Sequence, residues 1–124
     1  MKISVYHVKQ SLSRDERLSV TFPLISQGEP PRPVAAKRLF DRGGYEKVAT
    51  VEGDLSYAWA VTNNVHGSWS RDPAKGVTVE GPGYVEFDGR RYGYKSSEVG
   101  DIFVNEETGE MLVVDGFGFT SLQE

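Results

Sequence analysis

The sequence of 124 residues contains no cysteine, only two histidines and no long apolar run. The lack of cysteine excludes disulfide bonds and thiolate ligands for a metal. No segment approaches the roughly 20 apolar residues that a membrane-spanning helix needs. The first residues alternate as in a strand, whereas a signal peptide would bring a block of apolar residues. These absences predict a cytoplasmic protein that does not engage a membrane.

Recognisable catalytic patterns are missing as well. The two histidines, His7 and His66, form no HxH or HxxxH pair, so their spacing gives no sign of a metal site. The chain also has no GxSxG, GxxxxGKS/T or HExxH motif. We therefore expect no catalytic residue, no metal and no cofactor, with His7 packed inside the fold and His66 on its surface. The sequence predicts a protein that is not an enzyme.

What is present suits one domain over residues 1–124, because the length and the 38% hydrophobic content allow a modest core. Charge is uneven along the chain. Residues 1–47 hold nine Lys and Arg against five Asp and Glu, a net charge of +4, whereas residues 48–124 hold five against thirteen, a net charge of −8. Phosphate contacts need clustered cations, so the acidic half argues against a nucleic-acid partner there.

Local patterns assign elements along the first half. The expected elements are a strand at 2–8, a polar loop at 9–17, a short strand at 18–25, an extended linker at 28–33, a helix at about 33–42 and a strand at 45–51. Pro23 places the second strand at an edge or ends it, because proline cannot donate to a sheet ladder. Gly43-Gly44 closes the helix.

The main helix is expected at about 54–64. Asp54 follows Gly53 and can accept the free amide hydrogens of a first helical turn. One helical face then gathers the residues Leu55, Ala58, Trp59 and Thr62. Residues 67–82 are rich in Gly, Ser, Asp and Pro and predict a loop.

The last third predicts antiparallel strands. Asp88-Gly89 suits a tight turn between strands at 84–87 and 90–94, and this turn pairs Val85 with Tyr92 and Glu86 with Arg91. A second hairpin joins 101–105 to 111–115 through a turn that Gly109 closes, and it is expected to pair Val104 with Leu112 and Ile102 with Val114. The main helix is expected to cover those four side chains.

A final strand at 116–119 places two Phe rings on one face and two glycines on the other. Glycines inside a strand mark bends, and strongly bent short strands favour a partly closed barrel. The predicted fold is therefore α+β, with one main helix at 54–64 on a curved, mostly antiparallel and barrel-like sheet of five to seven strands.

Candidate binding residues lie where the main helix meets the following loop. Asn63, Asn64, His66 and Trp69 combine amide, imidazole and indole groups within seven positions. Trp69 is expected to plug the loop onto the sheet, because an exposed Trp without a partner is uncommon. A pocket between the helix end and the sheet would suit a small ligand or a nucleotide.

Two segments resemble known proteins. Residues 55–69, LSYAWAVTNNVHGSW, resemble the helix and loop, A-x-x-x-T-N followed by a Trp, of small proteins from actinobacteriophages and related mobile elements. Residues 96–119, SSEVGDIFVNEETGEMLVVDGFGF, resemble the ending of the same family and also a YodL-type domain. The resemblance implies a genomic setting, and hence the cytoplasm of a bacterial host, rather than a reaction. Folding chemistry alone can explain Ser97, Gly100 and Asp101 in this tail.

Three functions follow as hypotheses. The leading one is a non-enzymatic accessory protein of a bacteriophage or mobile element that binds a host or phage protein. The second is a small-ligand or nucleotide-binding domain, and the third is a nucleic-acid-binding protein that uses Arg32, Lys37, Arg38 and Arg42. The sequence leaves the partner and the oligomeric state open.

Overall fold

Strand β1 (Lys2–Val8) lies at the centre of the fold in the computed structural model, which describes residues 1–65, 67–116 and 118–122. Apolar side chains point to both of its faces, as a strand covered on both sides requires. It pairs antiparallel with β2 (Tyr45–Glu52) on one side and with β6 (Ile102–Asn105) on the other. The strands predicted at 2–8 and 45–51 are confirmed.

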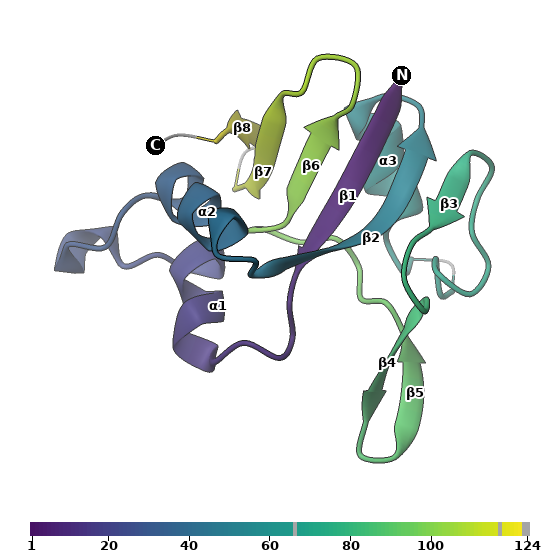
Figure 1. Cartoon of the computed structure of the whole chain (residues 1–124), viewed down its shortest axis with the longest axis horizontal. Helices are drawn as coiled ribbons and strands as arrows, with labels where there is room; N and C mark the ends of the chain where they lie inside the picture. The colour runs from purple at the N-terminus through teal and green to yellow at the C-terminus, as the bar shows by residue number, and fades with distance from the viewer. Residues whose placement is uncertain (66, 117, 123–124) are drawn as a thin grey trace.

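Six antiparallel strands form one open sheet, in the order β3-β2-β1-β6-β7-β8 (Figure 1). The strands not yet given are β3 (Val77–Val79), β7 (Met111–Asp115) and β8 (Gly118–Ser121). Strands β3 and β8 stand at the two ends of that order and pair with one neighbour each in the described chain. The predicted partly closed barrel is therefore wrong. Strand β3 also lies inside the segment 67–82 that was predicted as a loop.

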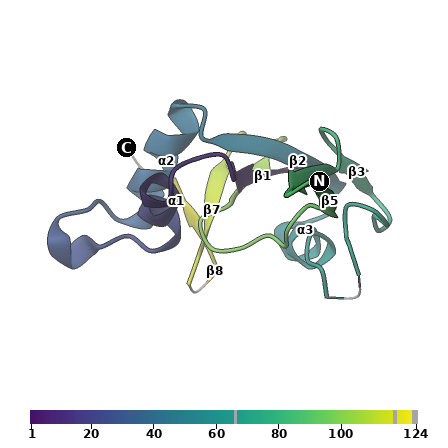
Figure 2. The ribbon, with the colours of Figure 1, turned by 90° about the horizontal axis from the view of Figure 1, so that it is seen from below.

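Three α-helices are present in the described residues, where one main helix was predicted. They are α1 (Arg14–Thr21), α2 (Arg32–Asp41) and α3 (Leu55–Val61), and a 3-10 turn, η1 (Ile25–Gln27), lies between the first two. Helices α1 and α2 lie together at one end of the sheet and α3 at the other (Figure 2). The helix predicted at 33–42 is confirmed within a residue at each end.

Two hydrophobic clusters hold these layers together. One joins α1 and α2 to the sheet through the residues Val8, Val20, Ala35, Ala36, Leu39, Tyr45, Ile102 and Val113. The other lies on the side of α3 and contains Ile3, Val5, Val48, Ala49, Val51, Ala58, Trp69, Tyr94, Phe103 and Val114. The strands between the clusters are apolar on both faces because both faces are covered.

Helix α1 corrects the predictions of a loop at 9–17 and a strand at 18–25. Ser13 caps it: the Ser13 hydroxyl accepts from the Glu16 amide at 3.2 Å and donates to the Glu16 carboxylate at 3.1 Å. The Ser13 hydroxyl thus satisfies one of the free amide hydrogens of the first helical turn. Only Val20 of the helix is buried, so the apolar periodicity that usually identifies a helix is weak here.

Helix α3 begins as predicted, with the Asp54 carboxylate accepting from the Tyr57 amide at 2.8 Å. It ends at Val61 rather than near 64, because Thr62 leaves helical geometry and bonds backward to the Ala58 carbonyl at 2.8 Å. The predicted apolar face packs against the sheet, with Ala58 and Thr62 fully buried.

The predicted strand pairing is correct in the first hairpin and wrong in the second. Strands β4 (Tyr84–Phe87) and β5 (Arg90–Gly93) pair as predicted, including Val85 with Tyr92, but they form a separate two-stranded sheet. In the second hairpin Phe103 pairs with Leu112 and Ile102 with Val113, so the predicted register is wrong by one residue.

That slip exchanges the faces. Phe103 and Val114 join the cluster on the side of α3, while Ile102 and Val104 pack on the side of α1 and α2. The prediction that α3 covers Ile102 and Val104 is therefore wrong. The final strand begins two residues later than predicted, and the placement of Phe117 lies outside the described residues.

Candidate functional site

The predicted binding residues come together in part. The Asn64 side chain accepts from the Trp69 amide at 2.9 Å and donates to the Tyr94 carbonyl at 3.0 Å. Trp69 is buried, as predicted, and its indole N–H donates to the Lys95 carbonyl at 2.8 Å. The Asn63 amide donates to a carbonyl in the last turn of α3. His66 lies outside the described residues.

These contacts give Asn64 and Trp69 a clear part in folding, since they fasten the loop after α3 to the segment that follows β5. Asn63 and Trp69 also line a hollow of about 270 Å³. The hydroxyl of Ser68, beside this hollow, is enclosed and has no hydrogen-bond partner in the described chain. A role for these residues in binding stays a prediction.

A second group of polar side chains is buried between β1, the end of α3 and the segment before β6. The Ser97 hydroxyl lies 3.0 Å from His7 Nε2 and 2.8 Å from the Thr62 hydroxyl. All three side chains are almost fully enclosed. Burial lowers the pKa of His7 well below its usual value of 6.5, and the nearby Lys95 ammonium acts in the same direction. The imidazole is therefore neutral at pH 7.

Asp101 completes this buried cluster. One carboxylate oxygen accepts from the Val8 amide at 3.0 Å, and the other accepts from the Glu98 amide at 2.9 Å and from Lys95 Nζ at 2.6 Å. Burial raises the pKa of Asp101, while the ammonium and the two amides oppose that rise. The carboxylate thus ties β1 to the turn that leads into β6.

Ser97, His7 and Asp101 are the residue types of a catalytic triad, but their geometry differs from one. In a triad the acid orients the imidazole through one ring nitrogen while the other faces the serine. Here Ser97 Oγ and Asp101 Oδ2 both lie against His7 Nε2, at 3.0 and 3.8 Å. All three groups are also closed to solvent. The cluster joins β1, the end of α3 and the segment before β6 inside the fold.

The β4–β5 hairpin extends away from the main sheet (Figure 1). Its two faces differ. Val85, Phe87, Tyr92 and Tyr94 line a groove of about 280 Å³ between the hairpin and the ends of β1 and β2. Phe87 is 73% exposed and Tyr92 47%, although both are large and apolar. The opposite face is polar, with the Arg91 guanidinium 4.5 Å above the Tyr84 ring.

Contacts at its base hold this hairpin in place. The Tyr94 hydroxyl donates to the Glu80 carbonyl at 2.9 Å and accepts from the Gly83 amide at 3.1 Å. The Ser70 hydroxyl accepts from the Tyr94 amide at 2.9 Å. An isolated two-stranded hairpin is marginally stable in water. These bonds therefore position the groove, and they leave the tip of the hairpin exposed.

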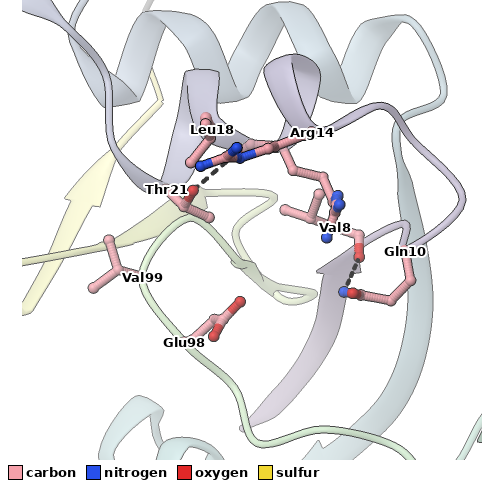
Figure 3. Close-up of a pocket in the computed structure, with 8 residues that line it drawn as sticks. Val8, Gln10, Arg14, Leu18, Thr21, Glu98 and Val99 are labelled. Carbon is pink, nitrogen blue, oxygen red and sulfur yellow. Dashed lines mark hydrogen bonds between the residues drawn. The ribbon is translucent and has the colours of Figure 1, made fainter.

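A larger cleft lies between α1 and the segment before β6 (Figure 3). It measures about 630 Å³ and contains Arg14 and Arg17 of α1, with Glu98 opposite. This cleft was not predicted, because residues 9–17 were expected to form a loop. The pattern Ser13-x-x-Glu16 was the signal that could have placed both arginines on one helix.

Two of the four basic residues predicted for nucleic-acid binding are engaged within the fold. Arg32 donates to Asp115 and to the Val20 and Thr21 carbonyls, and Lys37 donates to Asp41. These bonds leave Arg38 and Arg42 as the exposed members of that set.

Comparison with known proteins finds no family model, no curated protein and no solved structure that matches this chain. Within residues 1–65, 67–116 and 118–122, no three His, Cys, Asp or Glu side chains gather as metal ligands. In the same part of the chain, every helix is too short or too polar to cross a bilayer.

Proposed function

We propose that this chain is a non-enzymatic accessory protein that binds another protein through the β4–β5 hairpin. The observation that carries the proposal is the exposure of Phe87 and Tyr92 beside an apolar groove. The setting in a bacteriophage or mobile element, with a host or phage protein as partner, rests on the resemblance of residues 55–69 and 96–119.

The hairpin has the composition of a protein interface. Aromatic residues and arginine are enriched at the centres of such interfaces, and a few of them supply most of the binding free energy. Phe87 and Tyr92 can enter a partner's pocket, while the groove accepts an apolar side chain in return. Arg90 and Arg91 lie exposed at the margin, where charged groups set orientation and association rate.

The buried cluster supports a non-enzymatic role. A serine nucleophile must reach its substrate and must have a base aligned for proton transfer. Ser97 is enclosed, and His7 Nε2 faces both Ser97 and Asp101. These residues stabilise the fold instead.

The proposal is tested by capture experiments in a bacterial lysate with matched variants. We expect the wild-type chain to retain a protein that Phe87→Ser loses, because Phe87 is the most exposed aromatic residue of the hairpin. Phe22→Ser is the control, since Phe22 is 69% exposed on a different part of the surface. Both changes are expected to alter the unfolding free energy by less than about 0.5 kcal/mol.

The captured protein is then purified, and its affinity for each variant is measured by calorimetry. We expect Phe87→Ser to weaken the dissociation constant by at least about tenfold, in the range of an interface hot spot. Loss of binding with Phe22→Ser, and not with Phe87→Ser, would move the docking surface to the segment after α1. Equal binding by all three chains would refute the hairpin as the docking surface.

A further inference from the structure

The cleft beside α1 places two arginines on one wall. Residues 14, 17, 18 and 21 are spaced three, one and three apart, so an α-helix projects them from a single face. Asp15 and Glu16 fall on other faces, at about 100° and 200° around the helix from Arg14. The cleft therefore receives the two positive charges of α1 without its two negative ones. Figure 3 shows Arg14 reaching from the helix toward Val8 and Gln10.

Neither guanidinium has a partner within the described chain. Arg14 is exposed, and its side chain takes part in no hydrogen bond or ion pair among residues 1–65, 67–116 and 118–122. Arg17 Nε is enclosed, with no acceptor in reach. A buried donor left without an acceptor costs free energy, and such groups are rare in folded proteins.

Arg32 shows what a guanidinium used for folding looks like in the same protein. Its Nε donates to the Val20 carbonyl at 2.7 Å, one terminal nitrogen binds Asp115, and the other donates to the Thr21 carbonyl at 3.2 Å. Arg17 lies on α1, the helix whose last carbonyls Arg32 binds, and it has none of these bonds within the described chain. Its free Nε and its place in the cleft point to an acceptor that comes from outside the chain.

The other residues that line the cleft indicate which groups a ligand would carry besides its anion. Val8, Leu18 and Val99 supply apolar walls. Glu98 lies across the cleft from α1 (Figure 3), and its carboxylate is 3.6 Å from Lys95 Nζ, which partly neutralises it. A volume of about 630 Å³ falls within the range of small-molecule sites.

We propose that this cleft binds a small anionic ligand, with a phosphate or carboxylate group held by Arg14 and Arg17 and an apolar body against Val8, Leu18 and Val99. Guanidinium groups form paired, charge-assisted hydrogen bonds with both kinds of oxyanion. The cleft adjoins the hairpin groove and shares Val8 and Gln10 with it. Of the two, only the cleft contains the two arginines and only the groove contains the hairpin aromatics, so variants of each set test anion binding and protein binding separately.

The test is a titration of the full-length, ¹⁵N-labelled chain at constant ionic strength, followed by NMR through the arginine Nε–H signals. Inorganic phosphate, phenyl phosphate and benzoate are the three probes. We expect each binding probe to shift the Arg17 Nε–H signal, and the phenyl ring to tighten binding over inorganic phosphate. The ratio of phenyl phosphate to benzoate affinity identifies the preferred oxyanion. Constant ionic strength removes general screening as a cause of the shifts.

Variants assign the effect to the cleft. We expect Arg14→Gln and Arg17→Gln each to weaken binding about tenfold, as the loss of a charged hydrogen bond does. Glu98→Gln is expected to tighten it, because the change removes a negative charge that faces the ligand. Arg38→Gln removes an equal charge from the exposed surface of α2 and is expected to change nothing.

Because Arg14 is exposed, its variant keeps the test valid even if Arg17→Gln were to unfold the chain. No shift of either Nε–H signal at about 10 mM of any probe would overturn the proposal, since that places the dissociation constant far above the millimolar range. An equal loss with Arg38→Gln would also overturn it, because binding would then follow net charge rather than the cleft.

Discussion

Replacing Asp101 by asparagine tests the most enclosed charge in the fold. The Asp101 carboxylate accepts three hydrogen bonds, from the Val8 amide, the Glu98 amide and Lys95 Nζ, and it has no exposed surface. Asparagine has nearly the same shape but only one accepting oxygen. In either orientation of the amide, an NH₂ group would face at least one buried N–H donor.

The expected loss follows from these contacts. A buried donor without an acceptor costs about 1–3 kcal/mol, and removing one partner of a buried ion pair costs about 3–5 kcal/mol. Asparagine also removes the cost of burying a charge, the same cost that raises the pKa of Asp101. Lys95 is partly exposed and still has the Glu98 carboxylate at 3.6 Å, so losing the Asp101 charge destabilises the Lys95 ammonium less than it would a fully buried one. We expect a net decrease of about 2–4 kcal/mol in the free energy of unfolding.

The assay is urea unfolding at pH 7, followed by circular dichroism, for the wild type and both variants. Asp72→Asn is the control, because Asp72 is exposed and its side chain makes no ion pair or hydrogen bond with the residues that the structure describes. Its expected change is below about 0.5 kcal/mol. If Asp101→Asn lost less than about 1 kcal/mol, the three hydrogen bonds would not be stabilising β1 and the turn before β6 as described.

Three further changes probe the core, the pH response and a turn. Burial holds the pKa of His7 well below 6.5, so below that pH the unfolded chain takes up a proton that the folded chain refuses. The unfolding free energy should therefore decrease as the pH is lowered through this range, by up to about 1.4 kcal/mol per pH unit. His7→Gln should remove that part of the pH dependence in urea titrations, and an unchanged pH dependence would contradict this. Phe103→Ala, which empties the space beside Phe119 at 5.1 Å between ring centres, should cost about 3–5 kcal/mol by the same assay, and a loss below about 1 kcal/mol would contradict the packing. Gly100→Ala should lower the melting temperature, with a cost of about 1–3 kcal/mol, because φ is +98° there and a Cβ would lie 3.2 Å from Thr21 Cγ2; an unchanged melting temperature would count against that strain.

The hairpin at 102–115 shows that sequence patterns can predict two strands without predicting their register. The strands and the left-handed Gly109 were predicted correctly, but the turn closes between Asn105 and Glu110, one residue earlier than expected. The Asn105 side chain accepts from the amides of Glu107 and Thr108, which fixes a turn one residue longer than predicted. A one-residue slip reverses every side chain of a strand. Both faces here are apolar, so hydrophobicity could not choose between the registers.

The candidate sites were predictable to different degrees. The Asp88-Gly89 turn predicted the hairpin and its pairing, because that dipeptide favours a tight two-residue turn, but it did not predict that the hairpin stands apart from the main sheet. Trp69 was expected to be buried, and it is. The buried polar cluster joins His7, Thr62 and Ser97, which no local pattern connects. The cleft depended on recognising α1, whose polar sequence hides its periodicity.

The position of β1 also sets the order in which the protein can be completed. Its pairing with β2 closes a loop of about forty residues, whereas its pairing with β6 joins Ile3 to Asn105 across most of the chain. Contacts so distant in sequence slow folding, because the entropy of closing the loop is lost before the contact forms. During synthesis, one edge of the central strand therefore stays open until the last third of the chain emerges. A fragment that stops before residue 102 would present that edge to other chains, so we expect it to aggregate rather than fold.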